Sequence, residues 1–184
     1  MEIGNKDIHY KLIEAARFYD SAAQFELYNL YSKTMLNVSY RIVKDVSEAE
    51  DVLQESFVTA FNKLDSFRGD STFGSWLKRI VINASINVLK KRKIDYQLID
   101  ENRDDRADEI DIEASDLSVD HIKKAIMELP EGFRLVFSLY AMEGYDHKEI
   151  SEILNVSEST SKSQYNRAKR KLQMILKNMY NYER

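Results

Sequence analysis

The sequence of 184 residues contains no cysteine, one proline and five glycines. The absence of cysteine excludes disulfides and thiolate metal sites, which fits a reducing compartment such as the cytoplasm. Sheet-rich sandwiches and barrels need many turns built from proline and glycine, so their scarcity favours long helices. The N-terminus has no apolar signal-peptide core, and no apolar run is long enough to span a membrane. We therefore expect an all-α, cytoplasmic protein.

Acidic side chains are missing from two stretches of a chain that carries 27 basic and 31 acidic residues. From 71 to 93 every charged residue is basic, and from 159 to 177 there are six bases and no acid. Between 95 and 120, by contrast, eleven acids face two arginines. Segregation of this kind points to a nucleic-acid partner more than the net charge of −4 does.

Hydrophobic periodicity predicts two helical domains separated by a charged segment. Apolar residues recur at helical spacing through most of residues 1–93 and again through 119–184. Residues 94–118 have few apolar side chains and many charges, so we expect a flexible acidic linker there. The predicted fold class is all-α, with two small helical domains joined by this linker.

Three local patterns predict where helices begin. Ser47 with Glu50, and Asp146 with Glu149, have the spacing of a capping box, in which two side chains satisfy first-turn amides. Pro130 suits the first turn of another helix, because its missing N–H is no loss there.

Residues 146–171 have the dimensions of a helix-turn-helix: a short helix, a turn and a longer helix. The outward face of the longer helix carries the hydroxyl, amide and cationic groups that bond phosphates and base edges: Ser159, Lys162, Ser163, Asn166, Arg167 and Arg170. An ordinary helical hairpin would show the same periodicity, but a solvated face usually mixes charges of both signs. The missing acids favour DNA.

A second polar face lies on the helix predicted over 72–91. Its inner stripe is expected to be Leu77, Ile80, Val81, Ala84 and Val88, and its opposite stripe is Trp76, Arg79, Asn83, Asn87 and Lys90. The donor groups of the second stripe could follow a phosphate backbone. Phe67, Phe73 and Trp76 lie at the loop end, where exposed aromatics could stack on unpaired bases, although Phe73 alone is better interpreted as a core residue.

Signals of catalysis are weak in this sequence. His9, His121 and His147 are scattered, without the spacing of shared metal ligands, and no glycine-rich phosphate loop or nucleophile elbow occurs. We therefore predict no catalytic residue, no metal and no cofactor. Asp51, Gln54 and Glu55 form a small acidic patch that, by itself, is ordinary solvated surface.

Two distant segments resemble the ECF-type sigma factors of bacterial RNA polymerase. The motifs DVLQESF at 51–57 and FRGDSTFGSWLKRI at 67–80, followed by Asn83, look like the second conserved region of that family. The fourth region is matched by LPEGFR at 129–134, ISEILNVS at 150–157, TSKS at 160–163 and RAKRKL at 167–172. The order, the gap and the length agree as well, over residues 25–176.

The resemblance implies a role for each segment. The domain at 1–93 would be region 2, the domain at 119–184 region 4, and the linker at 94–118 would run through the RNA-exit path of the polymerase. The acidic patch would dock on the β′ coiled coil of core RNA polymerase. The loop at 67–72 would hold a base flipped from the minus-ten element, with contacts from Phe67, Arg68, Ser71 and Thr72.

The resemblance also implies how the remaining polar residues act on promoter DNA. Trp76, Arg79, Asn83 and Asn87 would line the path of the melted minus-ten strand, and the outward face of the last helix would read the minus-thirty-five element. An anti-sigma factor is an expected further partner. Three positions depart from the family pattern: Ser159 replaces a common glycine, Asn87 replaces a common aspartate, and Gly74 should loosen the first turn of its helix.

Two other functions are compatible with parts of the sequence. A stand-alone helix-turn-helix regulator of duplex DNA would explain 146–171, but would leave the loop at 67–72 and the acidic patch without a role. A helical adaptor that binds only protein would leave both acid-free faces unexplained.

Overall fold

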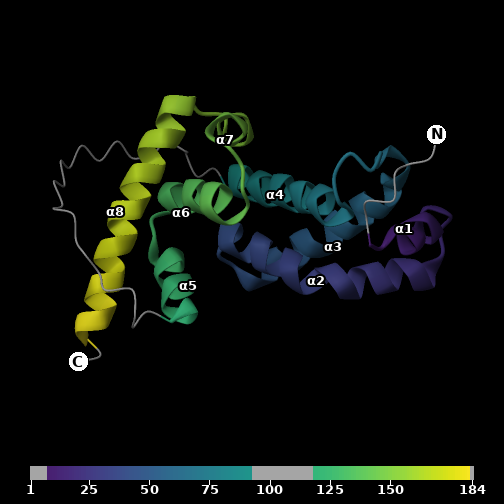
Figure 1. Ribbon diagram of the computed structural model, residues 1–184, viewed down its shortest axis with the longest axis horizontal. Helices are drawn as coiled ribbons and strands as arrows, with labels where there is room; N and C mark the ends of the chain where they lie inside the picture. Colours follow the sequence, from purple (N-terminus) through teal and green to yellow (C-terminus); the bar gives the residue numbers. More distant parts are fainter. Residues whose placement is uncertain (1–7, 93–117, 183–184) are drawn as a thin grey trace. The chain divides into compact units, whose positions relative to one another are not determined.

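The computed structural model describes residues 8–92 and 118–182, and every regular element in these two ranges is helical (Figure 1). The chain divides into two compact units, Met1–Lys93 and Ile94–Arg184. The predicted all-α class is therefore confirmed. The linker expected over 94–118 lies outside the described residues, apart from Ser118. Within the described ranges, no helix is both long and apolar enough to cross a bilayer.

Unit 1 is built on three long helices that pack side by side (Figure 1). These are α2 (Ser21–Val43), α3 (Val46–Asn62) and α4 (Phe73–Lys91), with the shorter α1 (Tyr10–Arg17) against α2 and a 3-10 turn at Leu64–Ser66. Their shared core contains Leu27, Met35, Ile42, Phe57, Leu77, Ile82 and Ile86. Each of the three long helices buries one face, as amphipathic patterning requires.

The start of α3 differs from the predicted capping box at Ser47 and Glu50. Asp45 is the N-cap, and its carboxylate accepts the backbone N–H of Glu48 at 2.9 Å. Lys44 ends α2 in the left-handed conformation at φ 57°, so Asp45 is the next residue in extended backbone. Aspartate caps a helix at least as well as serine does, so α3 begins earlier than predicted.

The buried face of α4 is also rotated relative to the predicted stripe. Leu77 and Val81 are buried as expected, but Ile80, Ala84 and Val88 are only half-buried. The buried residues are Phe73, Leu77, Val81, Ile82, Ser85, Ile86 and Leu89. Since α4 packs against both α2 and α3, it buries a wider face than a helix with one neighbour, and this face includes residues that the single stripe left out.

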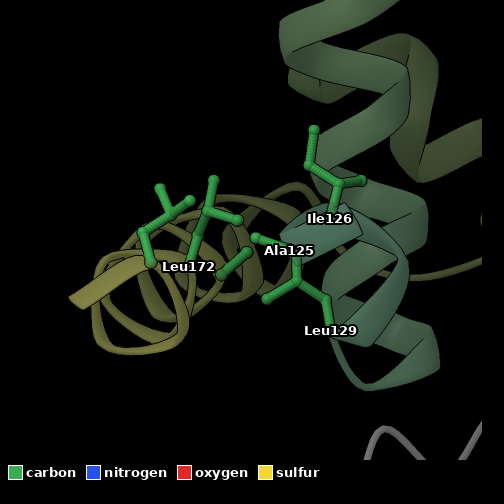
Figure 2. Packing of buried hydrophobic residues seen from close by; sticks show 6 residues of the cluster. Ala125, Ile126, Leu129 and Leu172 are labelled. Atoms are coloured by element: carbon green, nitrogen blue, oxygen red, sulfur yellow. The ribbon is translucent and has the colours of Figure 1, made fainter. Parts of the chain in front are cut away.

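Unit 2 consists of α5 (Val119–Glu128), α6 (Glu131–Phe137) with a π-helical turn at Ser138–Met142, α7 (His147–Leu154) and α8 (Glu158–Tyr182). Helix α8 packs against α5, α6 and α7. Ala125, Ile126, Leu129 and Leu172 belong to the apolar core of this unit, and Figure 2 shows Ala125 and Leu129 on the side that faces α8. Ala168 and Leu176 complete the buried cluster.

The predicted helix starts in unit 2 are confirmed. Pro130 is the N-cap of α6, and Asp146 with Glu149 forms a complete capping box at α7. Asn155 ends α7 in the left-handed conformation, and the Ser157 hydroxyl then accepts the N–H of Thr160 at 3.0 Å. A short helix, a turn and a long helix follow one another, as a helix-turn-helix requires.

Gly74 has a packing role that the sequence did not indicate. A Cβ atom at this position would lie 2.8 Å from Cε1 of Tyr31, closer than side chains tolerate. The Tyr31 ring cannot easily yield, because it packs edge-on against Phe73 and against His9, with ring centroids 5.3 and 5.8 Å away. Glycine at this position lets α4 approach α2 closely.

Gly74→Ala should therefore destabilise the protein by about 1–3 kcal/mol, the usual cost of overpacking, although alanine is the better helix former. Urea unfolding followed by circular dichroism measures this loss. In a Tyr31→Ala background the same substitution should become neutral or stabilising. A loss of equal size in both backgrounds would show that the tyrosine ring is not the cause.

Candidate nucleic-acid and polymerase interfaces

The acidic patch predicted at Asp51, Gln54 and Glu55 is exposed on α3. Gln54 and Glu55 follow Asp51 by three and four residues, so both lie beside it on the helix surface. Val58 continues this face and is 60% exposed. The sequence signal for Val58 is its spacing of seven residues from Asp51. The patch therefore combines carboxylates with an apolar side chain.

Phe67 is not the exposed aromatic that the sequence analysis expected. Its side chain is 7% exposed, and its ring packs against those of Trp76 and Phe73, with centroids 5.3 and 5.9 Å away. Phe73 is fully buried, in agreement with its interpretation as a core residue. Of the three rings, only that of Trp76 is half-buried. The cluster forms because the three rings, within ten residues of sequence, bury one another's apolar surface from water.

The loop between Phe67 and α4 places its polar side chains in solvent. Arg68, Ser71 and Thr72 are all exposed. Thr72 has a structural task as well, since it is the N-cap of α4 and accepts the N–H of Ser75 at 3.2 Å. Arg68 and Ser71 are therefore the loop residues whose side chains can be changed with the least effect on the helix start.

The polar stripe on α4 is brought together as predicted. Arg79, Asn83, Asn87 and Lys90 are exposed and spaced three or four residues apart, with half-buried Trp76 at the loop end. Arg92, in the same acid-free stretch, has a different environment. It forms an ion pair with Glu48, donates from Nε to Glu48 at 3.0 Å, and donates to the carbonyl of Val43 at 3.1 Å. This arginine holds the end of α4 to the α2–α3 turn.

The outward face of α8 carries the predicted residues on one side of the helix. Ser159, Lys162, Ser163, Asn166 and Arg170 are exposed, and Arg167 is half-buried. Ser161, Gln164 and Ala168 are buried on the opposite side. The Ser163 hydroxyl donates to the carbonyl of Thr160 at 2.9 Å, one turn back in the same helix. The same oxygen can still accept a hydrogen bond, and the residue is exposed.

Glu158, which the sequence analysis did not consider, lies beside this face. Its carboxylate is 2.6 Å from Nζ of Lys162, one turn along α8. It stands one residue before the acid-free stretch that begins at 159. Spacing of four residues between acid and base would have identified the pair. The hydrogen bond from Lys162, aided by its charge, lowers the pKa of the Glu158 carboxyl.

The two helices of the helix-turn-helix are fastened by an aromatic cluster. His147, at the start of α7, shares a hydrogen bond of 2.9 Å between Nδ1 and the Ser161 hydroxyl of α8. Its ring stacks on Tyr140 at 4.4 Å between centroids, and Tyr165 lies against both rings. Lys169 Nζ sits 5.1 Å from the Tyr165 centroid. These contacts fix the angle at which α8 presents its outward face.

Comparison with known families agrees with the two-unit architecture. The family model "Sigma-70 region 2" matches residues 27–94, and "Sigma-70, region 4" matches residues 120–172. The protein belongs to the sigma-70 type of RNA polymerase sigma factor.

Similarity to individual proteins places the chain in the ECF group of that family. The ECF RNA polymerase sigma factor SigW of Bacillus subtilis strain 168 is 30% identical over 181 residues, covering 92% of this chain and 97% of SigW. The RNA polymerase sigma-H factor of Pseudomonas aeruginosa PAO1 is 32% identical over 186 residues, covering 90% of this chain and 92% of that protein. The chain is thus an ECF-type sigma factor, and the family resemblance of its motifs is confirmed.

Solved structures share the fold. A complex of the sigma factor RpoE with the anti-sigma factor NepR from Bartonella quintana matches with a TM-score of 0.55 and 24% identity, covering 83% of this chain and 95% of that chain. CnrH in complex with the cytosolic domain of CnrY matches with a TM-score of 0.54 and 23% identity, covering 91% of this chain and 96% of that chain.

Removing Lys162 should raise the pKa of Glu158. The ion pair favours the charged carboxylate, so Lys162→Gln should return the pKa toward its ordinary value, whereas Lys169→Gln on the same helix should leave it unchanged. Any stability from the pair is present above the ordinary pKa and is lost as the pH falls through the lowered one. Carboxyl ¹³C chemical shifts followed by NMR titration measure this difference. Identical titration curves for the wild type and Lys162→Gln would refute the pairing.

Proposed function

We propose that this sigma factor binds core RNA polymerase through the α3 patch and directs it to promoters through the exposed polar faces of α4 and α8. The observation that carries the proposal is the pair of donor-rich faces, one on each compact unit. Residues 73–91 contain no acid, and within α8 the only acid is Glu158 at its first residue. Two faces of this kind suit two separate contacts with DNA, which a single helix-turn-helix would not need.

Unit 2 would read the minus-thirty-five element as duplex. A long exposed helix carrying lysine, asparagine and arginine fits the major groove, where these side chains bond phosphates and base edges. Asn166 is the strongest candidate for a base reader, because an amide can make two bonds to one adenine. Lys162 is the stronger candidate for a phosphate contact, once it leaves Glu158.

Unit 1 would hold the melted strand of the minus-ten element. Burial of the Phe67 ring changes the role proposed for it: the ring supports the loop from beneath instead of stacking on a base. The contacts to a flipped base would then come from Arg68, Ser71 and the backbone of the loop. Half-buried Trp76 would supply the aromatic surface, and Arg79, Asn83 and Asn87 would follow the strand.

The polymerase contact would use the whole face of α3 that includes Val58. An exposed aliphatic side chain beside two carboxylates fits a partner helix that offers basic and apolar residues together. The β′ coiled coil of core polymerase is the proposed partner. The acidic segment at 94–118, outside the described residues, would occupy the RNA-exit path.

The sigma factor itself would catalyse no covalent chemistry, and the polymerase would supply the reaction. We propose cytoplasmic action, where core enzyme and promoter DNA are found. The sigma factor RpoE from Bartonella quintana has been solved with the anti-sigma factor NepR bound, and such a factor is the proposed regulatory partner here. It would act by covering the surfaces that engage polymerase.

Reversal of charge at Asp51 and Glu55 to lysine should weaken binding to core polymerase at least tenfold, because two attractive contacts become repulsive. Binding is measured by competition for labelled core enzyme. Glu26→Lys, at an exposed acid on α2, is the matched control and should bind normally. Helicity should stay unchanged in all variants. Normal affinity in the double variant would return the α3 patch to ordinary solvated surface.

Variants of α8 should affect binding to duplex promoter DNA, and variants of the loop at 67–72 should affect promoter opening. Asn166→Ala should cost about 1–3 kcal/mol of affinity for promoter duplex at one base position. Ser71→Ala with Arg68→Gln should leave closed-complex binding intact and slow promoter opening. Mobility shifts measure the first effect, and permanganate reactivity of unpaired thymines measures the second. Phe67→Ala is a poor probe of the loop, since it would also disrupt a buried ring cluster.

A loss of duplex binding by the loop variant would instead show that the loop contacts duplex DNA before melting. Equal losses by Asn166→Ala on promoter and random sequence would argue against base reading by α8.

A further inference from the structure

Arg17, the last residue of α1, reaches across 50 positions of sequence to the loop before α4. Its Nη2 donates to the backbone carbonyl of Phe67 at 3.1 Å, and its Nη1 forms an ion pair of 3.0 Å with Glu14. The Arg17 side chain is 19% exposed, so most of it lies out of water. Helix α1 precedes the residues that match region 2 of the family, which begin at 27.

The contact falls where the exposed loop begins. Phe67 is the last buried residue before the exposed Arg68, and its ring is already fixed against Phe73 and Trp76. Arg17 adds a hold on the Phe67 backbone itself. At the other end of the loop, the Thr72 cap fixes the first turn of α4. The segment between these two points is therefore held at both ends.

A loop held in this way can present its side chains in one geometry before DNA arrives. Binding groups fixed in advance lose less conformational entropy when the ligand binds. The residue type matters, because a guanidinium presents several donors in a rigid fork and can reach Glu14 and Phe67 together. A lysine has a single side-chain nitrogen, which would have to donate to both the Glu14 carboxylate and the Phe67 carbonyl.

We propose that Arg17 is a positioning residue for the loop at 68–72, setting the geometry with which that loop receives an unpaired base. This inference rests on the proposed function, in which the loop acts on melted DNA. Arg17 would touch no DNA itself. It would act through the Phe67 carbonyl and the backbone that follows, and its Nε also lies 4.0 Å from the carboxylate of Asp65, two residues before Phe67.

The experiment compares promoter opening by holoenzyme that carries Arg17→Met, Ser71→Ala or both. Arg17→Met alone should slow opening about three- to tenfold, because a loop without this hydrogen bond must lose more conformational freedom when it receives the base. In the Ser71→Ala background the same substitution should cost much less, because a loop without its base contact gains little from being well placed. Affinity for core polymerase and for closed promoter should be unchanged.

Two further variants separate positioning from general stability. Arg17→Lys should recover part of the opening rate, because its ammonium can still donate to the Phe67 carbonyl. Lys11→Met, at an exposed base on the same helix, should open promoters normally. Thermal unfolding of each variant identifies any loss of folded protein, and rates are compared at a temperature where all variants are folded.

The outcomes distinguish this inference from the proposed function. A slow Ser71→Ala variant with a normal Arg17→Met variant overturns the role of Arg17 alone. Equal slowing by Arg17→Met in both backgrounds also overturns it, since that result is expected from general destabilisation. Normal opening by Ser71→Ala would remove the loop assignment itself, and the role of Arg17 with it.

Discussion

Burial of α4 between α2 and α3 is the constraint on which unit 1 depends. Leu77, Val81, Ile82, Ile86 and Leu89 have almost no exposed surface, and each buried aliphatic side chain contributes about 1.5–3 kcal/mol. A helix held on two sides has little freedom to rotate about its axis. The direction of Arg79, Asn83 and Asn87 is therefore set by apolar packing on the opposite side. The polar face needs no interactions of its own to stay in place.

Unit 2 solves the same problem with smaller side chains and polar contacts. Ala125 and Ala168 are fully buried in the core that joins α5 to α8, so these helices can approach closely. Nearer the start of α8, the hydrogen bond between His147 and Ser161 and the ring contacts around Tyr165 add to the aliphatic packing. Hydrogen bonds and ring contacts depend on orientation, so they help to fix the angle between α7 and α8. The angle is what a helix entering a groove requires.

Local patterns were predictable from the sequence, and contacts between distant segments were not. The Asp146 capping box, the Asn155 turn and the outward face of α8 depend on residues within one or two turns of each other. Ser47 is not the cap because Asp45, two residues earlier, already accepts the first-turn N–H of Glu48. Phe67 failed as an exposed ring because its burial depends on Phe73 and Trp76 folding over it. The hold of Arg17 on Phe67 joins residues 50 apart, and no periodicity reports such a contact.

The π-helical turn at Ser138–Met142 has a consequence for how related chains differ in length. In this turn the N–H of Glu143 bonds to the carbonyl of Ser138, five residues back, at 3.1 Å. A π turn accommodates one residue more than an α-helix would in the same length. Tyr140 lies within this turn and stacks against His147 of α7. A relative with one residue fewer in this segment could form a plain α-helix here and keep the same helix-turn-helix. A single-residue gap at this place in a sequence alignment would then mark a change from a π turn to an α turn. It would not mark the loss of a helix.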